Sequence, residues 1–257
     1  MKNWMKGPSE WDCPLKENRE GIFFPARQNI EALAYGRIIT GNDSYKLSGD
    51  YCVERLSDIE DFEFDLLSDP VIREVLERIS SVGNSCHEDR PVILEAEAPF
   101  SILSVLMNPV DLYLCFDEEP ALLAGILDRI ADASAAFIRA CIKVGCRLLS
   151  LADPTGTLNL VGENYYKEFC GKSALRMMKQ CEPFLNQALI HLCPKMARSM
   201  VMTGMMKEEP WRGVAAADHY IQILYAMAGD PAVHFAGSRC IWDAGQLNKS
   251  VQQLSLL

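Results

Sequence analysis

Short apolar runs and longer stretches of helical spacing alternate along the chain from residue 91 onward. The apolar runs have the length of buried strands and are bounded by turn-forming residues. We expect strands at 91–96, 147–152, 189–193 and 232–236, with a weaker one at 213–217. Helices are expected at 99–106, 120–144, 163–181, 194–206 and 218–228. This alternation predicts βα units and a parallel sheet.

The first 90 residues carry a weaker pattern. Glycine and proline interrupt residues 1–55, where only a helix over 28–38 is predicted. Asp69-Pro70 is a favourable helix start, and the apolar positions that follow it fall on one helix face. We expect this amphipathic helix to pack outside the sheet.

The length of the chain fits one large domain. A (β/α)8 barrel takes about 250 residues, and the chain has 257. We therefore predict an α/β protein of TIM-barrel type, (β/α)8, folded as a single domain over residues 1–257. Residues 1–55 are an abbreviated amino-terminal region, so a truncated or incomplete N-terminal side is left open.

Composition narrows the classes of function. A formal net charge of −10 argues against binding to a nucleic-acid backbone, which needs clustered Lys and Arg. The chain has no continuous apolar run of transmembrane length and no signal-like start, so we expect a cytoplasmic protein. Its ten cysteines then indicate thiols or metal ligands rather than a disulfide framework.

The tripeptide His191-Leu192-Cys193 and the later Cys240 are the strongest candidates for chemistry. On a strand, residues i and i+2 point to the same face, so the imidazole and the thiol of the tripeptide converge. Zinc binds such nitrogen and sulfur ligands, and catalytic zinc sites commonly use three protein ligands and keep one position open. The ordinary alternative is a core histidine beside cysteines that pack as small apolar residues.

Other polar residues follow the predicted strands. Asp153 ends the strand at 147–152, and the carboxyl ends of parallel strands meet at one edge of a sheet. We predict a catalytic role for Asp153 in orienting substrate or a ligand, although an Asp before Pro is also a common turn residue. Glu95 and Glu97 are expected either to face the same cavity or to lie solvated at its rim. Trp242 is either a structural aromatic or a wall of the pocket.

Several segments together resemble one known family. They are the Ala-Pro-Phe-Ser segment at 98–101, the Asp-Glu-Glu-Pro segment at 117–120, the stretch 145–154, the tripeptide 191–193, and Cys240. From about residue 56 to 240 the chain resembles the uroporphyrinogen decarboxylase superfamily. Within it, the chain is similar to the corrinoid-dependent methyltransferases that pass methyl groups to thiols such as coenzyme M. The decarboxylase branch lacks the thiol pair.

The resemblance implies a function and a set of partners. His191, Cys193 and Cys240 would bind Zn2+, and the protein would move a methyl group between a corrinoid carrier protein and a small thiol or similar acceptor. Zinc deprotonates a bound thiol at neutral pH, which agrees with this chemistry. The chain departs from the family at Pro194, where a glycine is usual, and in the shorter interval between the two cysteines.

Two alternatives stay open beside this interpretation. One is a tetrapyrrole decarboxylase-type lyase of the same superfamily, which would need cationic side chains in its cavity to hold carboxylates. The other is a non-catalytic relative that binds a corrinoid protein. The sequence leaves the methyl donor, the acceptor, the direction of transfer and a homodimeric state undecided.

Overall fold

The structure is a computed structural model of the chain. It describes residues 16–17, 22–24, 30–42, 45, 47, 51–85, 90–213, 219–237, 239–242 and 251–257. None of the helices in these segments is long and apolar enough to cross a membrane.

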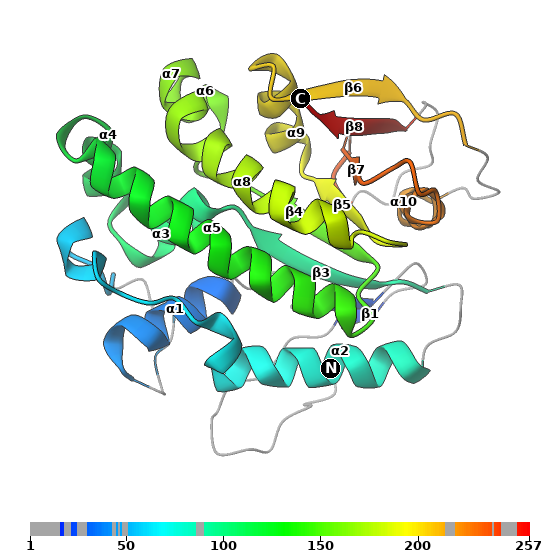
Figure 1. The fold of residues 1–257 in the computed structure, drawn as a ribbon, viewed down its shortest axis with the longest axis horizontal. Helices are drawn as coiled ribbons and strands as arrows, with labels where there is room; N and C mark the ends of the chain where they lie inside the picture. Colours follow the sequence, from blue (N-terminus) through cyan, green and yellow to red (C-terminus); the bar gives the residue numbers. More distant parts are fainter. Residues whose placement is uncertain are drawn as a thin grey trace.

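Five parallel strands form the centre of one sheet (Figure 1). They are β2 (Ile22–Phe24), β3 (Val92–Glu97), β4 (Leu148–Ala152), β5 (Leu189–Leu192) and β7 (Phe235–Ala236), paired in that order. The prediction of an α/β fold with a parallel sheet is therefore confirmed.

Three antiparallel strands extend the sheet at its two ends. β1 (Lys16–Glu17) pairs with β2, and β8 (Gln252–Leu256) joins β7 to β6 (Met206–Pro210). No ladder among the described strands connects β1 to β6. The parallel strands thus occupy the middle of the described strand order, and the outermost strands are antiparallel additions.

Helices connect the strands. In chain order they are α1 (Ile30–Thr40), α2 (Pro70–Ser85), α3 (Pro99–Leu106), α4 (Pro109–Glu118), α5 (Pro120–Lys143), α6 (Leu158–Val161), α7 (Glu163–Tyr165), α8 (Gly171–Cys181), α9 (Pro194–Met202) and α10 (Tyr220–Ala228). Short 3-10 turns lie at Leu56–Ile59, Leu66–Ser68 and Glu182–Phe184, and a π turn at Tyr166–Cys170 leads into α8. Helices α5 and α8 run side by side over one face of the sheet (Figure 1).

The two faces of the sheet belong to two apolar clusters. Because side chains alternate along a strand, neighbouring residues face opposite sides. Leu94, Leu149 and Ile190 pack into the large core that includes α5 and α8. The residues one position earlier, Ile93, Leu148 and Leu189, pack with α10 on the other face.

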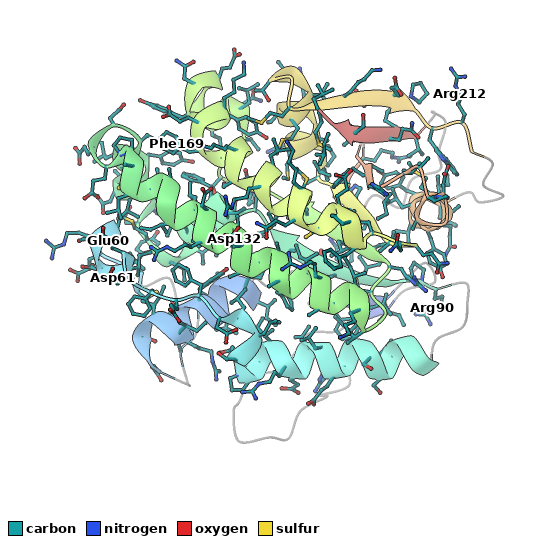
Figure 2. The ribbon with its side chains drawn as sticks, in the orientation of Figure 1. Glu60, Asp61, Arg90, Asp132, Phe169 and Arg212 are labelled. Carbon is teal, nitrogen blue, oxygen red and sulfur yellow. The ribbon has the colours of Figure 1, made fainter. Side chains whose placement is uncertain are left out.

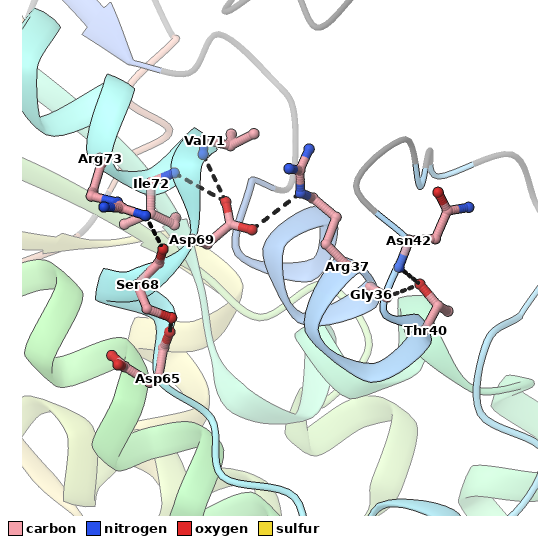
Figure 3. Close-up of polar contacts among 10 residues, drawn as sticks. All are labelled: Gly36, Arg37, Thr40, Asn42, Asp65, Ser68, Asp69, Val71, Ile72 and Arg73. Atoms are coloured by element: carbon pink, nitrogen blue, oxygen red, sulfur yellow. Dashed lines mark hydrogen bonds and ion pairs between the residues drawn. The ribbon is translucent and has the colours of Figure 1, made fainter. Parts of the chain in front are cut away.

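Polar contacts at the helix ends fix the helices to one another. The Asp69 carboxylate accepts hydrogen bonds from the backbone N–H groups of Val71 and Ile72 and caps α2. Its other oxygen accepts from Nε of Arg37 on α1 at 3.1 Å, and both side chains are nearly buried (Figure 3). Within the helices, Asp132 of α5, labelled in Figure 2, accepts two hydrogen bonds from Arg176 of α8, and this pair is exposed.

The structure corrects several predicted boundaries. The helix expected over 194–206 ends at Met202, because Gly204 adopts a φ of +72° and turns the chain into β6. Strand β6 was not predicted, since its Lys-Glu-Glu sequence is exposed and lacks an apolar run. The strand predicted at 232–236 is reduced to Phe235–Ala236. The weak strand at 213–217 falls, except for Gly213, outside the described residues.

Candidate active-site cavity

A cavity of about 310 Å³ opens at the carboxyl ends of β3, β4 and β5, and we call it the strand-end cavity. Eleven described residues line it: Glu31, Glu95, Ala96, Glu97, Ser150, Ala152, His191, Cys193, Cys240, Ile241 and Trp242. His191, Cys193 and Cys240, the three predicted zinc ligands, are among them, so the structure brings these side chains to one cavity.

Strand register explains why these side chains meet. Glu95 pairs with Ser150, and Ser150 pairs with His191, so the three lie in one row across the sheet. This row lies on the same face as the apolar row packed against α10, two residues further along each strand. This face of the sheet is therefore apolar nearer the amino ends of the strands and polar at their carboxyl ends, where the cavity lies.

His191 is buried, and both of its ring nitrogens have partners. Nε2 donates to the backbone carbonyl of Arg239 at 2.8 Å, since a carbonyl can only accept. Nδ1 lies 3.4 Å from the Ser150 hydroxyl, which can then donate to it. Burial lowers the pKa of His191 to about 4, so the ring is neutral at physiological pH. A neutral imidazole is the form that binds metals.

The two cysteines differ in exposure. Cys193 is half-buried at the start of α9, whereas Cys240 is exposed directly after Arg239. Within the described residues, no group of three or more His, Cys, Asp or Glu side chains is close enough together to hold a metal ion. The donor set suits zinc, but Nε2 of His191 is engaged by the Arg239 carbonyl.

Three glutamates form the acidic wall of the cavity. Glu31 of α1 is 1% exposed; its Oε2 accepts from the Glu97 backbone N–H at 3.0 Å, and Ser134 of α5 also interacts with the carboxyl. Burial raises the pKa of Glu31 to about 8. Burial, followed by the negative charge of Asp153, raises the pKa of Glu97 to about 7. Glu95 accepts a hydrogen bond from Nε1 of Trp242 at 2.7 Å.

Asp153 lies near the cavity but does not line it. It lies one position beyond the end of β4, whose residues Ser150 and Ala152 line the cavity. Its Oδ1 accepts from the Ser101 hydroxyl at 2.6 Å and from the Gly156 backbone N–H at 3.0 Å. Burial raises its pKa to about 6. These hydrogen bonds fix the turn from Asp153 to Gly156 against Ser101 of α3. The predicted catalytic role of Asp153 stays a prediction.

Sequence reasoning missed Glu31 as a site residue. A signal was present, because Glu31 interrupts the apolar stretch Ile30 to Tyr35 within a predicted helix. Because its neighbours on all sides of the helix are apolar, Glu31 has no polar helix face on which to be solvated. Trp242, expected either as a structural aromatic or as a wall of the pocket, lines the cavity.

Comparison with known proteins agrees with this architecture. The family model described as Uroporphyrinogen decarboxylase (URO-D) matches residues 50–214, which include β3, β4 and β5. The chain belongs to this family. The matched segment contains His191 and Cys193, whereas Glu31 and Cys240 lie outside it.

Individual relatives point to one branch of the family. The chain is 27% identical over 131 residues to "Methylcobamide:CoM methyltransferase MtaA" of Methanosarcina barkeri, a match that covers 51% of this chain and 38% of that protein. It is 20% identical over 143 residues to "Methylcobamide:CoM methyltransferase MtbA" of Methanosarcina acetivorans, covering 56% and 42%. The matches thus span about two fifths of these relatives' length.

A solved structure shares the fold. It is described as "methyltransferase from Methanosarcina mazei", superposes with a TM-score of 0.53 at 19% identity, and covers 68% of this chain and 51% of that chain. At this identity the likeness concerns the fold alone.

Proposed function

We propose that the protein is a zinc-dependent methyltransferase that moves a methyl group between a corrinoid carrier protein and a small thiol. One observation carries the proposal: an imidazole and two thiols line a single cavity at the carboxyl ends of parallel strands. The similarity to methylcobamide:CoM methyltransferases supports the choice of reaction. The carrier protein would present its corrinoid at the mouth of this cavity.

His191, Cys193 and Cys240 would hold the zinc ion. His191 is already neutral, and Ser150 orients its ring through Nδ1, so Nε2 would give up the Arg239 carbonyl to act as a ligand. When bound, zinc lowers the pKa of a thiol and so supplies a thiolate at neutral pH. Trp242 and Ile241 line the cavity beside Cys240 and would limit access of water to the acceptor.

Methyl transfer from the corrinoid to the thiol needs no additional oxidant, reductant or co-substrate. The acceptor thiol loses its proton to solvent, and its sulfur bonds to the methyl carbon. The methyl–cobalt bond breaks with both electrons remaining on cobalt, so the carrier returns as cobalt(I). The cavity walls contribute by holding the acceptor with its sulfur toward the two cysteines.

Metal analysis with matched variants tests the zinc site. Protein purified without chelator should hold one zinc ion per chain, and Cys193→Ser and Cys240→Ser should each reduce that content severalfold. Cys52→Ser is the control, because Cys52 is half-buried like Cys193 but does not line the cavity. Wild-type protein without stoichiometric zinc, or full zinc content in both site variants, would refute the assignment.

Activity tests the reaction itself. Zinc-loaded protein should demethylate methylcobalamin in the presence of a suitable thiol, which is followed by the cobalt absorption spectrum. Full zinc content with no methyl transfer to any thiol would favour the non-catalytic alternative. The tetrapyrrole decarboxylase alternative is disfavoured, because the described lining of the cavity carries three glutamates and neither Lys nor Arg.

A further inference from the structure

The imidazole ring of His191 is held on several sides. Nε2 donates to the Arg239 backbone carbonyl at 2.8 Å, and Nδ1 lies 3.4 Å from the Ser150 hydroxyl. The Tyr220 ring packs edge-on against the imidazole, with the two ring centres 5.6 Å apart. His191 and Tyr220 are both almost fully buried, so the imidazole cannot turn over without disturbing this packing. Any group that binds Nε2 must therefore replace the Arg239 carbonyl.

The segment 239–242 is attached to the cavity through its side chains as well. The Arg239 guanidinium lies 6.0 Å from the centre of the Tyr220 ring, a cation–π contact. Nε1 of Trp242 donates to Glu95 at 2.7 Å. These contacts and the carbonyl of Arg239 join the segment to α10, β3 and β5.

Two observations indicate that this segment must move for a metal ion to bind. Among the described residues, no three metal-binding side chains are close enough to share an ion, although His191, Cys193 and Cys240 line one cavity. Nε2 of His191 also donates to the carbonyl of Arg239, the residue directly before Cys240. Movement of the segment 239–242 changes both, because one short stretch of chain carries the carbonyl and the thiol.

Binding of a metal at Nε2 also changes where the ring proton lies. A neutral imidazole carries one proton, and a ring nitrogen that binds a metal carries none. While Nε2 donates to the Arg239 carbonyl, Nδ1 is unprotonated and accepts from Ser150. When Nε2 binds a metal, the proton is on Nδ1 and needs an acceptor. A serine hydroxyl serves in either case, because it has one donor and two acceptor lone pairs and can rotate.

We propose that Ser150 is a positioning residue for the metal site: its hydroxyl reverses from donor to acceptor when Nε2 of His191 leaves the Arg239 carbonyl for the zinc ion. The segment 239–242 moves in the same step and brings the Cys240 thiol to the ion. The ring loses a proton from Nε2 to solvent and gains one at Nδ1, so it stays neutral. The inference rests on the zinc site of the proposed function and adds a residue that controls its affinity.

Nitrogen NMR of full-length protein with isotope-labelled histidine rings reads the position of this proton. In chelator-treated protein we expect His191 to carry its proton on Nε2, and after addition of one equivalent of zinc ion on Nδ1. His191→Gln identifies the signal among the four histidines. Bound zinc with the proton still on Nε2 would overturn this inference and leave a zinc site standing. Protein that takes up no zinc would refute the proposed metal site and this inference together.

Variants of Ser150 test its role through zinc affinity, measured by competition with a chelator. Ser150→Ala should weaken zinc binding about tenfold or more, because the Nδ1 proton loses its acceptor. Ser150→Thr keeps a hydroxyl and should keep the wild-type affinity. Ser173→Ala is the control, because Ser173 is also buried but donates to the Cys170 carbonyl and does not line the cavity. Equal affinity of Ser150→Ala and wild type would overturn the positioning role.

The fluorescence of Trp242 tests the movement of the segment. Addition of zinc ion should change its emission, because the indole lies two residues beyond Cys240 and donates to Glu95. The change should persist in Trp211→Phe, since Trp211 does not line this cavity, and should be lost in Trp242→Phe. Stoichiometric zinc uptake with unchanged Trp242 emission would overturn the movement.

Discussion

Glu31 offers a direct test of how the cavity is built. The side chain is 1% exposed, and burial raises its pKa from 4.5 to about 8. Tyr35 of the same helix, Glu97 of β3 and Ser134 and Cys141 of α5 surround it. We predict that Glu31→Gln stabilises the protein at alkaline pH and has little effect at acid pH. Gln keeps an oxygen that can accept from the Glu97 backbone N–H.

The sign and size of this effect follow from proton linkage. The unfolded chain ionises Glu31 near pH 4.5, but the folded chain does so only near pH 8. The stabilising contribution of the neutral carboxyl is thus fully present below about pH 4.5 and is lost as the pH rises through about 8. The loss is about 1.4 kcal/mol per pH unit between these limits, or about 5 kcal/mol in total as an upper bound.

Urea unfolding, followed by far-ultraviolet circular dichroism from about pH 5 to about pH 9, measures the prediction. The difference in unfolding free energy between Glu31→Gln and wild type should grow with pH and level off above about pH 8. Comparing the two proteins removes the contributions of other titrating groups to first order. Glu60→Gln is the exposed control and should show no such growth. A difference that does not change with pH would refute the buried neutral carboxyl.

Three further outcomes are expected. Asp69→Ala should lower the unfolding free energy, measured in urea, by about 3 kcal/mol, because it removes the α2 cap and leaves Arg37 buried without this carboxylate. A loss under about 1 kcal/mol would contradict this prediction. Gly204→Ala should cost about 1 kcal/mol in the same assay, since its φ of +72° strains any residue with a Cβ, and an unchanged midpoint would argue against that backbone. Chelation should remove both zinc and methyl transfer, and added zinc should restore both; activity that survives complete zinc removal would exclude a catalytic metal.

The sequence pattern predicted the central part of the fold well. β3, β4 and β5 are apolar runs between turn residues, and their helices carry clear periodicity, so local signals sufficed. Alternation along β5 also predicted that His191 and Cys193 share a face. Asp153 lies one position beyond the end of β4 and does not line the cavity that Ser150 and Ala152 line. Its predicted catalytic role stays a prediction.

The edges of the sheet carried too little local signal. Strand β6 is exposed and charged, and β2 is only three residues long, so neither forms an apolar run that predicts a strand. Both are strands because a neighbouring strand supplies their hydrogen bonds. Pairing between distant segments does not show in the spacing of residues within one segment.

The sequence by itself determined the βα order and the placing of His191 and Cys193 at the end of one strand, because these depend on local periodicity. Only the tertiary structure brought Glu31 from α1 and Trp242 from the carboxyl-terminal part onto the same cavity. It also decided that the Arg239 carbonyl accepts a hydrogen bond from His191 and that Glu31 is buried beside Glu97 and Ser134. Burial and long-range contacts set these charges and hydrogen bonds, and both arise only when distant segments pack together.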